Sequence, residues 1–317
     1  MSEITNSDKT IAQVCIIVAD VEKSADIWRK VFNWGISDEV EVTHRHDHTK
    51  ATYYGEPTDA RAKIVHCGIG DIHFEMLQPL EPPSSWQDFL DQRGDGIHHV
   101  AFFVPDTEAA LKPYLAEGYQ VVHQGLFTGQ GGMYTYLDTD RDMGIIIELL
   151  EAFGDTRLPP APAFDRATGI GTDVICQVGV IVNDVLATSA RISAVLGQAQ
   201  PPIIQTPGYD LAKTMYRGAP SEATAKLAFF DFGQVQIELI EPDEQPSVWR
   251  DYLEAKGEGP QHIAFQVDNT RAVTDYLAGH GIDVIQEGLY ADGSGVYTYF
   301  DSDNLLGTTI ELLESFS

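Results

Sequence analysis

The stretch IHHVAFFV at residues 97–104 recurs as PQHIAFQV at residues 260–267, and this repetition decides the fold. Two further segments return at the same distance of 163 positions: MYTYLD at 133–138 as VYTYFD at 296–301, and IELLE at 147–151 unchanged at 310–314. A constant offset across three separate segments is the signature of an internal repeat. The chain therefore contains two copies of one domain.

The segment between the two copies, FGDTRLPPAPA at residues 153–163, is rich in proline and glycine. Such a composition cannot continue a helix or a central strand. The sequence therefore predicts a first domain at residues 1–152, a linker at 153–170 and a second domain at 171–317.

Each copy is itself doubled. An apolar run at residues 11–20 ends in Asp20, a residue type that caps helices, and apolar residues at helical spacing follow at 21–32. Residues 99–106 and 107–117 repeat this strand and helix. Each helix precedes three strand-like runs, which lie near 40–54, 62–69 and 72–78 and then near 119–127, 132–138 and 144–151. The predicted fold is α+β, with four βαβββ modules paired into two domains.

Composition excludes several classes of function. The 317 residues carry a net charge of -28, which disfavours nucleic acid because phosphate binding depends on cationic contacts. No run approaches the roughly 18 consecutive apolar residues that a membrane span needs, and the N-terminus has no secretory signal pattern. The three cysteines, Cys15, Cys67 and Cys176, form no CxxC pair and indicate reduced thiols, so we expect a cytoplasmic protein without membrane or nucleic-acid partners.

Four polar residues interrupt otherwise apolar strands in the first copy, and four stand at matching places in the second. They are Gln13, Glu75, His99 and Glu148, and then Gln177, Glu238, His262 and Glu311. A buried acid is costly unless it is paired or binds a metal. Two carboxylates, an imidazole and an amide suit a divalent ion such as Zn, Mn, Co, Ni or Fe(II). The alternative is an internal network of salt bridges and hydrogen bonds.

With these residues and four βαβββ modules, the chain resembles the vicinal oxygen chelate superfamily, which includes glyoxalase I, methylmalonyl-CoA epimerase, extradiol dioxygenases and bleomycin-resistance proteins. The resemblance implies curled sheets around a metal cleft, with ligands on the first, fourth, fifth and last strands of each domain. The order Gln, Glu, His, Glu is similar to zinc-type glyoxalase I. The segment EMLQP at residues 75–79, followed by His98 and His99, looks more like methylmalonyl-CoA epimerase, whose first ligand is usually His.

Both relatives imply one chemistry: a dication chelates oxygens of a small carbonyl substrate and stabilises an enediolate or enolate after proton removal. The resemblance makes Glu148 and Glu311 the candidate bases. We therefore expect an isomerase, an epimerase or a glyoxalase I-like lyase, either as a monomer that mimics a dimer or as a homo-oligomer. An Fe(II) extradiol-type dioxygenase, which needs two histidines and one carboxylate, and a non-catalytic binding protein of the resistance type are the alternatives.

Other histidines lie outside this set. His44, His46 and His48 alternate, so on a strand they would share one face and line the first pocket, or else mark a solvated strand end or hairpin. His98 should face away from the ion, because adjacent strand residues point to opposite sides. We interpret His66 and His73 as structural or peripheral. The alternating Tyr134, Tyr136, Tyr297 and Tyr299 indicate core packing or a hydroxyl in the pocket.

Overall fold

The computed structural model describes residues 9–154 and 164–316. Half of the predicted linker at 153–170, residues 155–163, lies outside these residues. The chain divides into two compact units: the first comprises residues 9–26, 35–154 and 232–234, and the second comprises residues 27–34, 164–231 and 235–316. These units follow the two sequence copies except for two short segments counted with the other unit. The boundaries of the predicted domains stay a prediction.

The first copy contains β1 (Ile11–Ile17), α1 (Val21–Phe32), β2 (Glu41–Val42), α2 (His46–Thr49), β3 (Thr52–Tyr53), β4 (Glu56–Pro57), β5 (Ala62–Ile69), β6 (Ile72–Pro79), α3 (Ser85–Arg93), β7 (Gly96–Phe103), α4 (Thr107–Ala116), β8 (Val121–Leu126), β9 (Gly132–Leu137), α5 (Asp140–Met143) and β10 (Ile146–Ala152). Its strands form one sheet in the order β2-β5-β6-β1-β7-β10-β9-β8-β3-β4. The two modules therefore meet where β1 pairs with β7, at the middle of the sheet.

The second copy repeats this arrangement with β11 (Ile175–Ile181), α6 (Val185–Leu196), β12 (Ile204–Gln205), α7 (Tyr209–Ala212), β13 (Met215–Tyr216), β14 (Ala219–Pro220), β15 (Ala225–Phe232), β16 (Val235–Pro242), α8 (Val248–Lys256), β17 (Gly259–Gln266), α9 (Thr270–Ala278), β18 (Val284–Leu289), β19 (Gly295–Phe300), α10 (Asp303–Leu306) and β20 (Thr309–Ser315). Its strand order, β12-β15-β16-β11-β17-β20-β19-β18-β13-β14, is that of the first sheet. The predicted α+β fold of paired modules is confirmed.

Local sequence signals explain how each module begins. The Asp20 side chain accepts a hydrogen bond from the backbone N–H of Lys23 at 3.1 Å, and Asp106 accepts one from Ala109 at 2.9 Å. Both aspartates follow a strand and satisfy an N–H group at the start of a helix that has no partner within the helix. The predicted capping role of these residues is confirmed.

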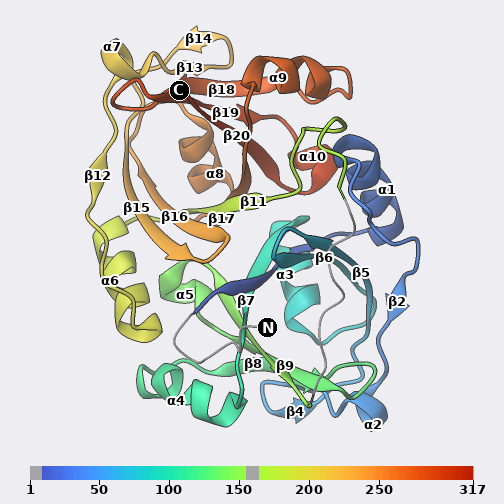
Figure 1. The fold of residues 1–317 in the computed structure, drawn as a ribbon. Coiled ribbons are helices and arrows are strands. Elements are labelled where there is room, and N and C mark those ends of the chain that lie inside the picture. The colour runs from blue at the N-terminus through green and yellow to red at the C-terminus, as the bar shows by residue number, and fades with distance from the viewer. Residues whose placement is uncertain (1–8, 155–163, 317) are drawn as a thin grey trace. The chain divides into compact units, whose positions relative to one another are not determined.

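Each curled sheet holds a short helix within its curve, α3 in the first unit and α8 in the second (Figure 1). Trp86 of α3 packs in a buried cluster with Cys15, Leu77 and Tyr136. Trp249 of α8 packs likewise with Ile181, Ile240 and Tyr299. Burying apolar surface stabilises such a cluster by about 25 cal/mol per Å². The two helices therefore close one side of the concave faces that carry the polar residues.

One predicted strand is wrong. Residues 40–54 contain the two-residue strands β2 and β3, with the helical turn α2 between them. The turn ends at Lys50, which adopts a left-handed conformation with φ of 55°. A left-handed residue cannot continue an extended strand, so the strand that the alternating pattern predicted does not form here.

Candidate metal centre

The eight predicted ligand residues lie on the four central strands of each sheet. In the first unit, Cys15 of β1 is in register with Glu75 of β6 on one side and His99 of β7 on the other. One step along the sheet, Ala101 is flanked by Gln13 and Glu148. Residues directly opposite each other on neighbouring strands share a face. The four predicted side chains of the unit therefore project from one face of the sheet.

The second unit has the same register around Gly179 and Ala264. Gly179 lies between Glu238 and His262, and Ala264 lies between Gln177 and Glu311. Ala101 of the first unit and Ala264 of the second are fully buried, and their short side chains leave space between the longer side chains on either side. The repeated register explains why the same four residue types stand together twice.

All four predicted residues of the second unit converge. His262 Nε2 lies 3.1 Å from a carboxylate oxygen of Glu311 and 3.6 Å from one of Glu238. The ligand atoms of these three residues all lie within 4.8 Å of one another. One terminal atom of the Gln177 amide lies 3.2 Å from each of the two carboxylates. His262 is fully buried, and the other three are 3–7% exposed.

The orientation of the Gln177 amide is set by its neighbours. Gln177 Nε2 donates to Gln236 Oε1 at 3.0 Å, and Gln236 Nε2 donates to Asp231 at 2.7 Å. This relay leaves the Gln177 oxygen facing the two carboxylates, an arrangement that favours a cation or a proton between them. Reversing the amide would satisfy the carboxylates but would put its oxygen against the Gln236 oxygen. We keep the first orientation because the Asp231 carboxylate can only accept, which fixes the direction of both amides.

The first unit brings its residues together differently. His99 Nε2 lies 2.9 Å from a carboxylate oxygen of Glu148, and Glu75 lies 3.5 Å from His66 Nδ1. The group whose ligand atoms all lie within 4.8 Å of one another consists of Cys15, Glu75 and His99. Gln13 is 5% exposed and lies on the same face, two residues before Cys15. Sequence reasoning missed Cys15, although its position two residues after Gln13 on one strand was a signal for it.

Gly179 occupies the place of Cys15 in the second unit. A Cβ atom built at Gly179 would lie 1.8 Å from His262 Cε1 and 2.3 Å from Nδ1. The imidazole of the second unit therefore fills the space that the cysteine side chain fills in the first. Glycine is required here by this close approach of a ring.

We call the cluster of Gln13, Cys15, Glu75, His99 and Glu148 the first cradle, and that of Gln177, Glu238, His262 and Glu311 the second cradle. Buried charges influence the protonation of both. Burial lowers the pKa of His262, but the nearby carboxylates of Glu311 and Glu238 outweigh it and raise that pKa to about 9. Burial raises the pKa of Glu238, against the effect of His262. Burial and the Glu75 carboxylate raise the pKa of the Cys15 thiol well above its usual value. Without a cation, the second cradle favours extra protons, and the Cys15 thiol of the first keeps its proton.

Two tyrosine hydroxyls face these carboxylates. Burial raises the pKa of Tyr299, helped by the charges of Glu311 and Glu238 and by a hydrogen bond to Glu311. Burial and the carboxylates of Glu148 and Glu75 raise the pKa of Tyr136 in the same way. Both hydroxyls therefore stay protonated, and Tyr299 can donate to Glu311. Tyr136 and Tyr299 therefore fit both sequence interpretations, because each ring packs in the core and its hydroxyl faces the cradle.

The residues present fit a divalent cation. His99 Nε2, Glu148 Oε2 and His262 Nε2 are buried and make no aligned hydrogen bond among the residues that the structure describes. Buried polar atoms are nearly always satisfied, so several such atoms at one place indicate a missing partner. Two carboxylates balance a dication, and imidazole, carboxylate and amide oxygen are ligands for Zn, Mn or Fe(II).

A side-chain contact at Nδ1 positions the imidazole of each cradle. His262 Nδ1 lies 3.0 Å from Gln261 Oε1, and Gln261 donates in turn to the backbone oxygen of Val248 at 3.1 Å. In the first unit, His99 Nδ1 lies 2.9 Å from His98 Nδ1. A hydrogen bond at Nδ1 leaves Nε2 directed at the cradle, which is how metal-binding histidines are usually held. His98 is thus a supporting residue.

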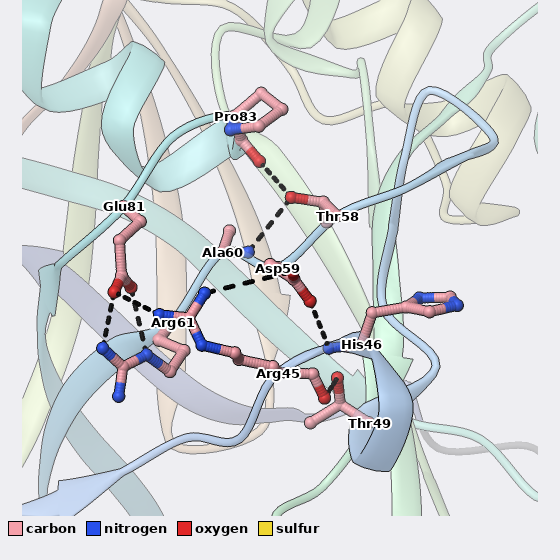
Figure 2. A network of polar contacts seen from close by, with 9 residues as sticks. All are labelled: Arg45, His46, Thr49, Thr58, Asp59, Ala60, Arg61, Glu81 and Pro83. Carbon is pink, nitrogen blue, oxygen red and sulfur yellow. Dashed lines mark hydrogen bonds and ion pairs between the residues drawn. The ribbon is translucent and has the colours of Figure 1, made fainter.

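His44 contacts His48, and His46 and His48 contact backbone oxygens rather than the predicted ligands. His46 Nδ1 contacts the backbone oxygen of Ala51 at 2.7 Å, and His48 Nε2 contacts that of Thr128 at 3.0 Å. Figure 2 shows the neighbouring polar network, in which Glu81 accepts from Arg45 and Arg61. The expected alternation on a strand is wrong, because His46 and His48 lie on the turn α2.

A cavity of about 190 Å³ lies in the second unit, beside α8. Arg217, Lys256, Asp301 and Gln261 are among its lining residues, whereas the four predicted ligands are not. Its lining residues nearest to the cradle include Gln261, which contacts His262 Nδ1, and Thr309, which is in register with His262. We therefore do not assign the substrate to this cavity.

Comparison with known proteins follows the repeat. A family model described as the Glyoxalase/Bleomycin resistance protein/Dioxygenase superfamily matches residues 12–136 and again residues 176–300. The chain belongs to this superfamily. The predicted resemblance to vicinal oxygen chelate proteins is therefore confirmed, and members of the superfamily use a divalent metal. Glu148 and Glu311 lie just beyond the matched segments.

Individual relatives of this superfamily member are distant. The uncharacterized protein YqjC of Bacillus subtilis (strain 168) is 28% identical over 98 residues, which are 31% of this chain and 70% of that protein. A triple mutant of 4-hydroxymandelate synthase from Streptomyces coelicolor superposes with a TM-score of 0.60 at 18% identity, covering 97% of this chain and 93% of that one. BphC, a halotolerant catechol dioxygenase, gives 0.51 at 11% identity, covering 98% and 88%. At such identities the structural likeness shows the fold alone.

Among the described residues, no helix combines the length and apolar character needed to span a membrane.

Proposed function

We propose that this superfamily member is a divalent-metal-dependent enzyme that moves a proton next to a carbonyl, and that the second unit holds the working centre. The observation that carries this proposal is the convergence of Gln177, Glu238, His262 and Glu311 in one buried cradle. In the first unit, by comparison, Cys15 occupies part of the equivalent space.

Each residue of the second cradle has a role. Gln177, Glu238 and His262 would hold the ion, with the amide fixed by Gln236 and the imidazole by Gln261. A bound dication supplies Lewis acidity, which stabilises the negative charge that develops on the carbonyl oxygen when the neighbouring proton leaves. These residues exclude water from the cradle, because all of them are nearly buried.

Glu311 is the proposed base. Its carboxylate lies 3.1 Å from His262 Nε2, and its charge helps to raise the pKa of the Tyr299 hydroxyl, which therefore stays protonated and can donate to it. A neighbouring hydroxyl of this kind can orient the carboxylate, so that Glu311 takes the proton and returns it. Proton transfer by a positioned group contributes typically about 10²–10⁴-fold to the rate.

The test follows proton exchange. Metal-loaded protein is incubated in deuterated water with a panel of α-hydroxy carbonyl compounds, thiohemiacetals and acyl thioesters, and deuterium next to the carbonyl is measured. We expect Glu311→Gln to lower exchange by about 10²–10⁴-fold, with Glu148→Gln as the matched control in the other unit. Metal content is measured for both variants, because glutamine keeps one oxygen ligand. Unchanged exchange in both variants would disprove the base assignment, and loss only in Glu148→Gln would move the working centre to the first unit.

An Fe(II) dioxygenase is a second candidate, favoured by one observation. His66, 3.5 Å from Glu75, adds a second imidazole to the first cradle, so that His66, His99 and Glu75 together give two histidines and one carboxylate. That set is typical of non-haem Fe(II) oxygenases. Oxygen uptake by the Fe(II)-loaded protein with a catechol, abolished by His66→Phe, would support this candidate. Tight ligand binding by metal-free protein, without exchange or oxygen uptake, would instead indicate a binding protein.

A further inference from the structure

The first cradle contains a side chain that the second one lacks. Cys15 is fully buried, and its sulfur belongs to a group with Glu75 and His99 in which all ligand atoms lie within 4.8 Å of one another. The backbone register explains this placement, because Cys15 lies directly between those two residues on the neighbouring strands. The sulfur therefore projects from the same face of the sheet as the predicted ligands.

The two units are built around this difference. Where the second unit has Gly179, the ring of His262 lies within 1.8 Å of the place a Cβ would take. In the first unit that space belongs to Cys15, and the His99 ring lies between Glu148 at 2.9 Å and His98 at 2.9 Å. The Cys15 side chain thus fills part of the space that the His262 ring occupies in the second unit.

A second observation points to a ligand at this place. His99 Nε2 and Glu148 Oε2 are buried and, although 2.9 Å apart, make no aligned hydrogen bond among the described residues. Both residues are at most 2% exposed. His99 also belongs to the group with Cys15 and Glu75, so a cation there would complete a set of nitrogen, oxygen and sulfur donors.

We propose that Cys15 is a metal ligand and that the two units prefer different ions. The first cradle, with a sulfur donor, selects a thiophilic dication such as Zn²⁺, whereas the second, with only nitrogen and oxygen donors, takes a harder ion such as Mn²⁺ or Fe²⁺. Soft thiolates favour zinc, and carboxylate and amide oxygens favour manganese. A coordinating thiol gives up its proton to the solvent when it binds the ion and acts as a thiolate.

This proposal rests on the proposed metal dependence, so the experiment separates the two. The full-length protein, reduced and metal-free, is titrated with Co²⁺ without oxygen, and the absorption spectrum is recorded. We expect two ions per chain with ligand-field absorption and, for one of them, a sulfur-to-cobalt charge-transfer band in the near ultraviolet. Cys15→Ser should lose this band and keep the second ion.

Matched controls use the other two cysteines. Cys176 precedes Gln177 and donates to the backbone oxygen of Ala264, and Cys67 lies on β5. Cys176→Ser and Cys67→Ser should both keep the band. Excess Zn²⁺ should displace first the ion that gives the band, and excess Mn²⁺ should leave that ion in place.

The outcomes are distinct. Two bound ions without a charge-transfer band, or a band that persists in Cys15→Ser, would overturn the proposal and leave the proposed function intact. Failure to bind Co²⁺ at all would contradict the proposed function itself. If Cys15→Ser does not fold, X-ray absorption of the zinc-loaded wild-type protein decides instead, because a coordinated thiolate gives a sulfur shell at about 2.3 Å and its absence refutes ligation.

Discussion

The two units carry the same four side chains on the same strands but surround them with different neighbours. The first cradle is bordered by groups that titrate or bind soft metals, whereas the second has amides, glycine or apolar side chains at the same places. The pairs are Cys15 and Gly179, His66 and Phe229, His73 and Gln236, His98 and Gln261, and His123 and Gln286. The comparison shows that duplication preserved the ligand positions while the supporting residues diverged.

The supporting contacts show what this divergence changes. In the second unit, Gln261 and Gln286 both contact the start of α8, through the backbone oxygen and nitrogen of Val248. In the first unit, His123 Nδ1 lies 3.3 Å from the hydroxyl of Ser85, the residue that matches Val248. Amides hold one protonation state at every pH, whereas imidazoles do not. The contacts that support the second cradle therefore depend less on pH than those that support the first.

The largest effect is expected from giving the second unit a side chain at Gly179. In Gly179→Ala the new Cβ would lie 1.8 Å from His262 Cε1, so the imidazole must leave the cradle. Overpacking of this kind costs about 1–3 kcal/mol of stability, and we expect metal binding by the second unit to be lost. The measurement is calorimetric metal titration together with denaturant unfolding. Gly129→Ala, where an added Cβ meets nothing within 4 Å, is the control. Unchanged stoichiometry would mean that the ring position does not matter.

A smaller effect is expected from breaking the relay that orients Gln177. Gln236→Met removes the acceptor for Gln177 Nε2 and the contact to Asp231 while keeping the side-chain length. Loss of such a partner typically lowers metal affinity by about 10- to 100-fold. Competition with a chromophoric chelator would measure the affinity, and Gln266→Met, an exposed glutamine on β17, is the control. Equal affinities for the wild type and Gln236→Met would show that the amide is not a ligand.

Much of the fold could be predicted because it rests on long, repeated, strongly patterned segments. The strands holding Glu75, His99 and Glu148 are apolar and continuous, so a polar residue inside them is conspicuous. The turn at His46–Thr49 could not be predicted, because alternation over a few residues suits a strand and a turn equally. Its structure depends on the left-handed Lys50 and on contacts such as that of His48 with the backbone oxygen of Thr128, which is distant in the sequence.

The supporting residues were harder to find than the ligands. Cys15 reads as one more apolar residue in its strand, and Gly179 as a small one, so neither stands out until both are placed next to a histidine. His123 and Gln286 lie on strands distant in sequence from the ligands, and only the folded sheet brings them to α3 and α8. Their roles come from tertiary packing, which hydrophobic periodicity does not encode.

The smallest effect expected is a difference in acid sensitivity caused by His123. Burial lowers the pKa of His123 to about 3, and the groups packed around it are Ser85, Trp86 and the rings of Tyr53, Tyr134 and Tyr136, none of which is anionic. Because the folded pKa lies below the usual value of 6.5, the unfolded chain binds more protons between these values, so His123 adds stability above about pH 6.5 that is lost as the pH falls towards 3. At about pH 5.5 this loss amounts to about 1.4 kcal/mol. His123→Gln, which installs the second unit's residue, should remove that part of the pH dependence between about pH 8 and 5.5, measured by denaturant unfolding, whereas the exposed His280→Gln should not. Parallel pH profiles for the wild type and His123→Gln would show that the buried imidazole does not distinguish the two units.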